Sequence, residues 1–594
     1  MKYWKYLLLG ALGTGSTMAQ LTYPGCDAVQ STDFAVTEMV SRKGGSGATQ
    51  DPDMSEPTRM EVQVIKKDGL YDHTNIFYVE RLGNVKFFDG GLKKVTLMGK
   101  ISVYGKSDNG LMGIVLDPNY ETNRWLYLWY TPNQLLGKNR QLVLARYTVK
   151  SDNTLDMASA KELMRLLASS TDEWHTGGPM QFDSYGDLWG TVGNNTADLD
   201  PAQCTAGNNV LSKTDSSTSA EWGPSNTASL RGGFWRIHPD DKATTQRKDK
   251  SGTYGPGYTV PAGNFGEYWA NEFEKQGKPA ALVAQYRDPL KVLPEIYVKG
   301  ERSNFSIAVH PTKRWLAWGT VNYSTTNDEF NLTDHPIFTG FPYFHNNNVN
   351  TCTNGQDPAS PKNTSPMNSG VQDLPPATPG VLNYGVGGWT VNVAIGGPIY
   401  TFDPSLNSDV KFPPSFHNKW LLGGFYDISQ KGGLYVATFD TTTLKVTNTL
   451  RIDNGIFSGV KIRNFIGAKY GADGALYILN YDGYYNSALN PSVMRVTYTG
   501  KCKVPVVTKA VAKPRNVGYQ NIWLSQRDLK VKEPGRHTFT LFDLAGNKVY
   551  SATGVQGAQY VFSDLEAKAG IKRGVYLVKV ETAAGEFVRQ ASLL

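Results

Sequence analysis

This sequence of 594 residues lacks the short motifs that would assign a chemistry directly. It contains no Gly-rich phosphate loop, no serine nucleophile elbow and no closely spaced cysteine or histidine pairs of the kind that bind zinc. Nucleotide-binding, serine-hydrolase and zinc-enzyme functions are therefore weakly supported. Helical periodicity is scarce as well: only residues 158–169 have clear helical spacing, and they could equally form an edge strand after a turn.

Long apolar runs are also missing. After the N-terminal leader, no segment offers about 18 uninterrupted apolar residues, the length that a transmembrane helix needs. The leader, residues 1–19, combines Lys2 and Lys5 with a short apolar core and small residues up to Ala19, which is the pattern of a cleaved signal peptide. We expect an exported protein without a transmembrane segment, located outside the cell or on its outer surface.

Cysteine is rare, with 4 in the whole chain. An even number in an exported protein favours disulfides over unpaired buried thiols. The four residues are Cys26, Cys204, Cys352 and Cys502. Three pairings are possible, and we prefer the one that joins Cys26 to Cys502 across the ends of the main domain and Cys204 to Cys352 between long loops.

Charge of one sign is not concentrated on the main body. The formal net charge is +7, but the excess of lysine and arginine lies in residues 504–594 and in the leader. The rest of the chain is close to neutral, so no basic surface for a nucleic acid partner is predicted.

The composition favours short strands separated by turns. Aromatic residues make up 12% of the chain, with 61 Gly and 31 Pro, so we expect an all-β protein. One unit recurs, a turn followed by a short aromatic and β-branched strand, at residues 75–79, 124–129, 186–189, 313–318, 432–436 and 474–478. Such repetition indicates radial symmetry, as in a β-propeller, although a stacked pair of β-sandwiches would also fit. Insertions at residues 201–228, 240–289 and 322–377 explain the irregular spacing.

The composition changes near residue 504. Residues 504–520 are rich in proline, valine and lysine and are predicted to form an extended linker. Residues 521–594 alternate between apolar and polar side chains in several short runs, which predicts a small β-sandwich domain. The main β domain then covers residues 20–503.

Chemistry-bearing residues gather in a predicted hairpin, residues 175–196. His175 and a Gly177–Gly178 pair precede the first strand, and a polar loop with Asn194 follows the second. Because the strands run antiparallel, both ends emerge at one edge, so His175 and Asn194 can face one cavity. The alternative is an ordinary hairpin with a surface histidine.

Residues 64–500 resemble the glucose/sorbosone dehydrogenase-like family. The strings that carry the resemblance are Asn109–Pro118, His175–Gly178, Leu230–Gly232, Arg236–Pro239, Pro294–Gly300, Gly396–Tyr400 and Asp473–Tyr477. Members of this family are six-bladed propellers, and its characterised enzymes use pyrroloquinoline quinone (PQQ) with calcium. The C-terminal unit resembles the sorting domains of the type IX secretion route, which implies that secretion machinery as a partner.

The resemblance implies roles for particular residues. His175 takes the place of the general base that acts on a sugar hydroxyl while hydride passes to the quinone, and a neutral imidazole suits that task. Arg302 and Lys469 would face the anionic cofactor, Arg302 with the paired donors that suit a carboxylate.

Other matches are to binding positions. Asn194 and Arg231 lie near positions that contact the cofactor in the family. Asp328 and Glu329 match an acidic pair in which the glutamate is a calcium ligand, since hard oxygen donors suit that ion.

Several strings depart from the family pattern. Asn194 replaces a carboxylate that orients the histidine, so the tautomer of His175 is expected to lose its support. The turn that offers backbone carbonyls to calcium reads Gly319–Asn322 here. The Arg-Asn-Pro string reads Arg302–Asn304, and Phe338–Pro342 replaces another family string.

Two functions follow. The first is an exported PQQ- and calcium-dependent dehydrogenase that oxidises a sugar and passes electrons to an external acceptor. The second is a non-catalytic surface propeller that binds carbohydrate through loop aromatics such as Phe344, Tyr384 and Trp389. Burial of these rings between blades is the competing explanation for them.

Overall fold

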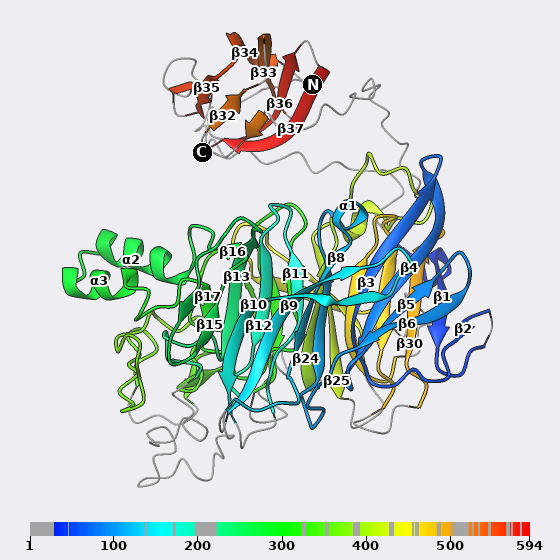
Figure 1. Ribbon diagram of the computed structural model, residues 1–594, viewed down its shortest axis with the longest axis horizontal. Coiled ribbons are helices and arrows are strands. Elements are labelled where there is room, and N and C mark those ends of the chain that lie inside the picture. The colour runs from blue at the N-terminus through cyan, green and yellow to red at the C-terminus, as the bar shows by residue number, and fades with distance from the viewer. Residues whose placement is uncertain are drawn as a thin grey trace, which may run out of the picture. The chain divides into compact units, whose positions relative to one another are not determined.

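The structure is a computed structural model, and the chain divides into two compact units, Met1–Pro505 and Val506–Leu594 (Figure 1). The residues that the structure describes are 29–45, 47–136, 139–169, 174–195, 223–322, 328–350, 356–383, 392–426, 433–453, 457, 462–483, 489–500, 502, 522–524, 528–532, 535–543, 548–562, 564–565, 571, 574–582 and 585–593. The predicted signal peptide and nearly all of the predicted linker lie outside these residues.

In the described part of the first unit, the strands form six sheets of four to six strands and one separate hairpin. The first two sheets are β3 (Pro57–Lys67), β4 (Leu70–Glu80), β5 (Asn84–Asp89) and β6 (Lys94–Lys100), and β7 (Leu111–Leu116), β8 (Trp125–Tyr130), β9 (Arg140–Val149), β10 (Leu155–Ala168), β15 (Gly252–Tyr254) and β14 (Arg247–Lys248). The next two are β11 (Met180–Phe182), β12 (Leu188–Val192) and β13 (Gly233–Pro239) with β16 (Tyr258–Thr259) and β17 (Ile296–Lys299), and β18 (Ala308–Val309), β19 (Leu316–Thr320), β20 (Glu329–Thr333) and β23 (Leu382–Asn383). The last two are β24 (Asn392–Ile399), β25 (Lys419–Tyr426), β26 (Tyr435–Phe439) and β27 (Val446–Arg451), and β28 (Phe465–Tyr470), β29 (Leu476–Asn480) and β30 (Ser492–Tyr498) with β1 (Phe34–Ser41) and β2 (Thr49–Gln50). The all-β prediction is confirmed.

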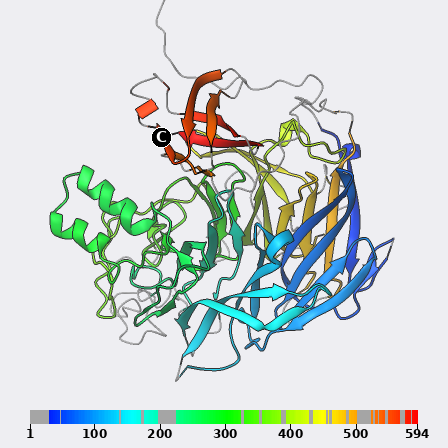
Figure 2. The same cartoon turned by 45° about the horizontal axis from the view of Figure 1, so that its top comes forward.

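The six sheets form a closed ring. Their first strands contact one another in the order β3, β7, β11, β18, β24, β28 and back to β3, and Figure 2 shows the sheets following one another around the unit from blue to orange. The same strands line a central cavity of about 310 Å³. Radial repetition predicts this arrangement, whereas a stacked pair of sandwiches would not enclose a cavity with six first strands.

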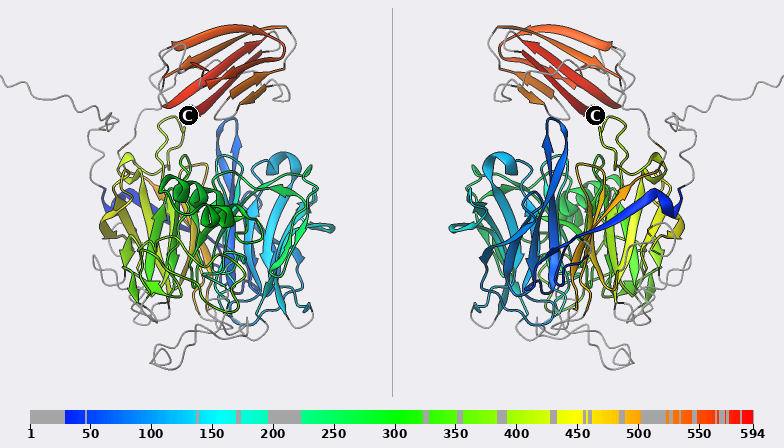
Figure 3. Two further views of the ribbon diagram at one scale, coloured as in Figure 1. Left: turned by 90° about the vertical axis from the view of Figure 1, so that its left-hand side faces the viewer. Right: turned by 90° about the vertical axis from the view of Figure 1, so that its right-hand side faces the viewer.

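The last sheet joins the two ends of the ring. The strand β1 pairs with β30 in antiparallel register, Phe34 opposite Tyr498, so two early strands, β1 and β2, complete a sheet with three late ones. Figure 3 shows this sheet and its neighbours from two sides. Closing a ring in this way leaves the first and last parts of the unit hydrogen-bonded to each other.

The recurring sequence unit corresponds to the second strand of five sheets, β4, β8, β12, β19 and β29. In two of these strands an aromatic residue is anchored by an aspartate of the preceding turn, through the 2.9 Å bond from the Tyr127 hydroxyl to Asp117 and the 3.0 Å bond from Trp189 Nε1 to Asp183. Such bonds satisfy polar groups that would otherwise be buried unpaired. The sixth instance falls on a third strand, β26, and β25 is the second strand of that sheet.

Residues 158–168 lie in strand β10, which pairs with β9 on one side and β15 on the other, so the segment is a strand, but not an edge strand. Helices occur instead within the insertion at residues 240–289. Helix α2 (Phe265–Lys275) and helix α3 (Ala280–Arg287) pack through buried Phe273 and Tyr286. The remaining short elements are α1 (Tyr120–Asn123), the hairpin of β21 (Phe344–His345) and β22 (Val349–Asn350), and 3-10 turns at Ser31–Asp33 and Pro414–Phe416.

None of the helices in the described part of the chain has both the length and the apolar character that crossing a membrane requires.

The second unit contains two sheets in its described part. One is β31 (Ile522–Leu524), β32 (Asp528–Val531) and β35 (Ala558–Val561); the other is β34 (Lys548–Val555), β33 (Arg536–Phe542), β36 (Gly574–Thr582) and β37 (Gly585–Leu593). Alternate residues of both sheets meet in one apolar core that includes Leu529, Phe539 and Val578. The predicted alternation of apolar and polar residues is what lets each sheet bury one face.

Candidate functional site

The site begins at the open end of the β11–β12 hairpin, where His175 has a left-handed backbone conformation with a φ of 59°. This conformation is unfavourable for a side chain larger than glycine and is held by its surroundings. The His175 backbone N–H donates to Asp108 Oδ2 at 2.8 Å. Gly193 lies so close that a Cβ there would be 2.3 Å from the His175 carbonyl oxygen. Both contacts fix the position of the His175 backbone, from which the imidazole extends.

The imidazole of His175 is oriented by Asn194. The His175 Nδ1 lies 2.7 Å from Asn194 Oδ1, and these residues are 7% and 0% exposed. An amide oxygen can only accept a hydrogen bond, so Nδ1 carries the hydrogen and Nε2 holds the lone pair. The sequence-based expectation that the neutral amide leaves the tautomer unsupported is therefore wrong. What the substitution removes is the negative charge that would stabilise an imidazolium.

Asn194 is positioned through its own backbone. Its N–H donates to the Arg302 carbonyl oxygen at 2.7 Å, and its carbonyl accepts a 3.0 Å hydrogen bond from Arg231 Nε. A second donor of Arg231, Nη2, bonds the carbonyl of Asn195. The structure thus places Arg231, predicted to contact the cofactor, beneath the loop that carries Asn194, where the guanidinium is 2% exposed.

Arg302 belongs to the same site as His175, because Asn194 contacts both residues. The Arg302 Nη1 donates to the carbonyl oxygens of Val321 and Asn322, each at 3.0 Å. These two carbonyls directly follow the strand β19, and the Arg302 side chain is 5% exposed. A guanidinium stays charged at any physiological pH, so this region carries a permanent positive charge.

Asp328 and Glu329 are neighbours in sequence but contact different groups. Asp328 Oδ1 accepts the Asn322 N–H at 3.1 Å and Oδ2 accepts the Ala394 N–H at 3.0 Å, which ties the β19 sheet to the β24 sheet. Burial raises the pKa of Asp328 to about 7, and these N–H donors and Arg302 oppose the rise.

Glu329 lies with Glu301, a residue that the sequence analysis missed. Thr320 Oγ1 donates to Glu301 at 2.7 Å, and Asn331 Nδ2 lies 3.2 Å from Glu329 Oε1 and 3.1 Å from Thr320 Oγ1. Burial raises the pKa of Glu301 to about 7 and that of Glu329 to about 8, and the Glu301 charge adds to the rise at Glu329. The sequence signal that could have identified Glu301 is its position next to Arg302, just after the buried strand β17.

Lys299, at the end of β17, is another buried charge at this site. Its ammonium donates to three main-chain carbonyls, those of Gly223 at 2.7 Å, Ser229 at 2.9 Å and Arg231. Burial lowers the pKa of Lys299 well below its usual value, and nearby Arg231 lowers it further. The lysine thus braces the loop that carries Arg231.

Two parts of the calcium site implied by the resemblance, the turn carbonyls and Asp328, are engaged in other contacts. The carbonyls of Val321 and Asn322 accept hydrogen bonds from Arg302 instead of facing an open position. Both oxygens of Asp328 accept backbone N–H groups. Within the described ranges, no group of three or more acidic, histidine or cysteine side chains is arranged to hold a metal ion.

The donor set does suit a quinone that carries carboxylates. His175 offers a ring nitrogen with a lone pair, and Arg302 supplies a cationic guanidinium, the group best matched to carboxylate oxygens. The two residues are joined through Asn194 at one edge of the β11 sheet.

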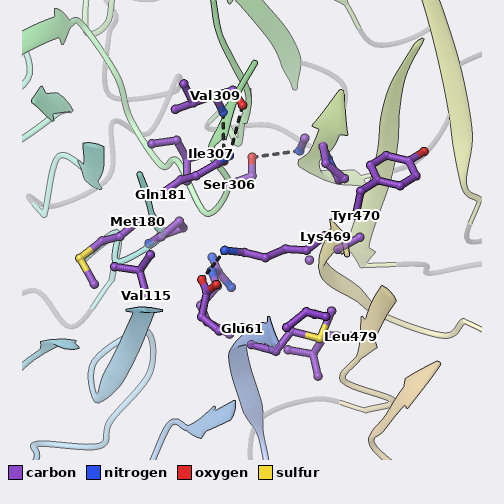
Figure 4. A pocket seen from close by; sticks show the side chains of 18 of the residues that line it. Glu61, Val115, Met180, Gln181, Ser306, Ile307, Val309, Lys469, Tyr470 and Leu479 are labelled. Carbon is purple, nitrogen blue, oxygen red and sulfur yellow. Dashed lines mark hydrogen bonds and ion pairs between the residues drawn. The ribbon is translucent and has the colours of Figure 1, made fainter. Parts of the chain in front are cut away.

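The predicted cofactor contact of Lys469 stays a prediction. Lys469 lies in the central cavity, where it forms an ion pair with Glu61 of β3 (Figure 4). Arg59 reaches across the ring to the carbonyls of Phe305 and Ile466. Arg302 precedes Phe305 by three residues and Lys469 follows Ile466 by three, so Arg59 links the two segments that carry these cations.

Two other sets of predicted residues lie mostly outside the described part. Cys502 is disulfide-bonded, but Cys26, Cys204 and Cys352 are outside the described residues, so the pairing stays a prediction. Of the loop aromatics, Tyr384 and Trp389 are also outside them. Phe344 is 0% exposed in the core, so it offers no surface for stacking a sugar.

Comparison with known proteins gives one family match. Residues 66–214 match the family described as Glucose / Sorbosone dehydrogenase, a segment that contains His175 and Asn194 and ends before Arg302. No curated protein matches the chain.

Among solved structures, a putative oxidoreductase (glucose dehydrogenase) from Thermus thermophilus is 16% identical, with 78% of this chain and 99% of that chain covered and a TM-score of 0.46. The soluble aldose sugar dehydrogenase of Escherichia coli in its apo form is 17% identical, with coverage of 78% and 99% and a TM-score of 0.46. The PQQ-bound aldose sugar dehydrogenase of Streptomyces coelicolor is 13% identical, with coverage of 75% and 99% and a TM-score of 0.42.

The predicted resemblance is therefore confirmed for residues 66–214, which carry the sequence signature of the glucose/sorbosone dehydrogenase family.

Proposed function

We propose that the protein is an exported, PQQ-dependent sugar dehydrogenase-like oxidoreductase built on a six-bladed β-propeller. The observation that carries the proposal is the 2.7 Å contact between His175 Nδ1 and Asn194 Oδ1. It leaves Nε2 as the nitrogen that can accept a proton, and it does so in a buried setting beside Arg302. The family match over the segment that holds both His175 and Asn194 gives independent support.

His175 acts as the general base. Its Nε2 takes the proton of a sugar hydroxyl while the hydrogen on the same carbon departs with its electron pair, and the carbon–oxygen bond becomes a carbonyl. A bound quinone supplies the two-electron acceptor for that hydride. Arg302 would hold a carboxylate of the cofactor, and Asn194 keeps the imidazole in the productive tautomer and orientation. An external electron acceptor then completes the cycle.

The neutral amide at Asn194 has a definite cost. In another enzyme class, replacing the orienting aspartate by asparagine lowers the rate by about four orders of magnitude because the wrong tautomer is selected. Here the tautomer is the productive one, so the loss is confined to the missing stabilisation of the imidazolium. We therefore expect a slow dehydrogenase instead of an inactive one.

The ends of the chain fit the same proposal. Residues 1–19 serve as a signal peptide, residues 504–520 as a linker, and residues 521–594 as a β-sandwich that directs the protein through the type IX secretion route to the cell surface or the medium. The alternating apolar pattern and shared core of the second unit support the sandwich.

The experiment is reconstitution of the full chain with PQQ, followed by dye reduction with a panel of sugars. We expect turnover in the native sequence and a loss of about 100-fold to 10,000-fold in kcat for His175→Ala, because general-base catalysis contributes that much. Lys469→Ala is the matched control, since this residue lies in the central cavity, and it should retain most of the activity.

Absence of both PQQ binding and dye reduction in the native protein would contradict the proposal. Equal losses in His175→Ala and Lys469→Ala would contradict the role given to His175. Circular dichroism of each variant shows whether the fold has survived the substitution.

A further inference from the structure

We infer that the Arg302 guanidinium takes the place of a metal ion at the carbonyl pair of Val321 and Asn322, so that the site binds its anionic ligand without calcium. The inference rests on the proposed function for the identity of that ligand, a planar quinone bearing carboxylates. The occupancy of the carbonyl pair by Arg302 stands on the geometry alone.

The first step is the shape of the carbonyl pair. Two consecutive main-chain oxygens, those of Val321 and Asn322, converge on a single nitrogen, Arg302 Nη1, at 3.0 Å each. Convergent carbonyls form an electronegative position that suits either a hard cation with oxygens at about 2.4 Å or an N–H donor. The distances here are those of hydrogen bonds.

The second step is the way the guanidinium is held. The Arg302 carbonyl accepts the Asn194 N–H at 2.7 Å, and the side chain is 5% exposed. Backbone and side chain are therefore both anchored, so the group does not swing aside at small cost. A calcium ion at the same carbonyls would have to approach a fixed positive charge at contact distance, where Coulomb repulsion is strong in a poorly solvated site.

The third step concerns the neighbouring acid. Asp328 lies within the electrostatic reach of Arg302, since the Arg302 charge favours its ionised form. Asp328 Oδ1 accepts the N–H of Asn322, the residue whose carbonyl Arg302 binds. Asp328 thus accepts from the N–H of Asn322, and Arg302 donates to its carbonyl. These two side chains hold the segment in place of a bridging metal ion.

The consequence is a built-in cation for the ligand. A carboxylate-bearing quinone would be met by a guanidinium, whose planar donors match a carboxylate, and no dissociable ion would be needed. Chelators should leave binding intact, and removal of Arg302 should uncover a position that calcium can fill.

The test measures PQQ binding and calcium binding by calorimetry with the full chain after treatment with EDTA. For the native protein we expect the PQQ dissociation constant to change less than about twofold when calcium is added. For Arg302→Ala we expect PQQ binding in EDTA to weaken by about 10-fold to 100-fold, the range for charge-assisted hydrogen bonds, and added calcium to restore most of the loss. Arg302→Lys is the matched variant, because it keeps a positive charge and should gain no calcium dependence.

Direct calcium titration separates this inference from the proposed function. Arg302→Ala should bind one more calcium ion than the native protein and Arg302→Lys should not, whether or not PQQ binds. Any ion held through Glu329 would be lost in Glu329→Gln and unaffected by Arg302→Ala. The inference is overturned if native PQQ binding requires calcium, or if Arg302→Ala folds and gains no calcium site. Failure of all forms to bind PQQ, with the calcium gain present, would overturn only the proposed function.

Discussion

Charged groups are arranged in opposite ways at the open end of the hairpin and in the central cavity. At the open end, the cations Lys299, Arg231 and Arg302 donate to main-chain carbonyls, and the acids Glu301 and Glu329 accept from neutral donors. In the cavity, Lys469 and Glu61 pair with each other, while Arg59, which also lines it, donates to the carbonyls of Phe305 and Ile466. Carbonyl dipoles stabilise a cation without cancelling its charge, whereas an ion pair is neutral as a unit. Buried charges with perturbed pKa values cluster at functional sites.

The largest expected effect that tests this comparison is the pH dependence of the free energy of unfolding. Burial raises the folded-state pKa of Glu301 to about 7 and of Glu329 to about 8, above the ordinary value of 4.5 that applies when the chain is unfolded. Between these values the folded state binds more protons, so the free energy of unfolding falls as pH rises from about 5 to about 8. Each group contributes on the order of 3 kcal/mol, and the two contribute less than their sum because they are coupled.

Urea denaturation of the native protein and of the Glu301→Gln/Glu329→Gln variant at pH 5 and pH 9 checks this. The variant should lose less stability between the two pH values. The opposite trend, a native protein more stable at pH 9, would mean that these carboxyls are ionised and compensated in the folded state.

A smaller effect is expected when charge is added beside His175. Asn194→Asp places a carboxylate on Nδ1, which keeps the tautomer and stabilises the imidazolium, so the pKa of His175 should rise. We expect kcat to rise by about tenfold near neutral pH and the acidic limb of the pH–rate profile to move upward. Asn194→Ala, which removes the acceptor, should lower kcat. A rate unchanged in Asn194→Asp would show that orientation alone limits His175.

The smallest effect on stability is expected for substitutions of the ion pair in the central cavity. Burial raises the pKa of Glu61 and Lys469 opposes that rise. The lysine is 30% exposed on its side chain, so Lys469→Met should destabilise the protein by about 1 kcal/mol, and the Glu61→Gln/Lys469→Met double variant should recover most of it. Thermal unfolding of the native protein, of Glu61→Gln, of Lys469→Met and of the double variant gives the coupling energy. A large loss of catalysis in Lys469→Met would place this residue with Arg302 after all.

Much of this organisation could be predicted from the sequence. The hairpin pattern brought His175 and Asn194 together because antiparallel pairing fixes which ends meet. The pairing of Lys469 with Glu61 could not be found in the same way, because Glu61 lies 408 residues away in the chain. The partners of Arg302 were also out of reach, because they are main-chain carbonyls that no side chain announces. Glu301 stands beside Arg302 in the sequence, but its partners are side chains of other strands, the Thr320 hydroxyl and the Glu329 carboxyl.

The pairing of β1 with β30 has a consequence for how the protein is made. The Thr497 side chain bonds the carbonyl of Ala35, 462 residues earlier in the chain. Each of the other five first-unit sheets starts from one contiguous stretch, so it can assemble as the polypeptide emerges, but the closing contact has the highest loop-closure cost and should form last. Until then β30 presents an unpaired edge that can template association with other chains. A chain of this design therefore depends on rapid closure of the ring, or on a chaperone that shields that edge until the ring closes.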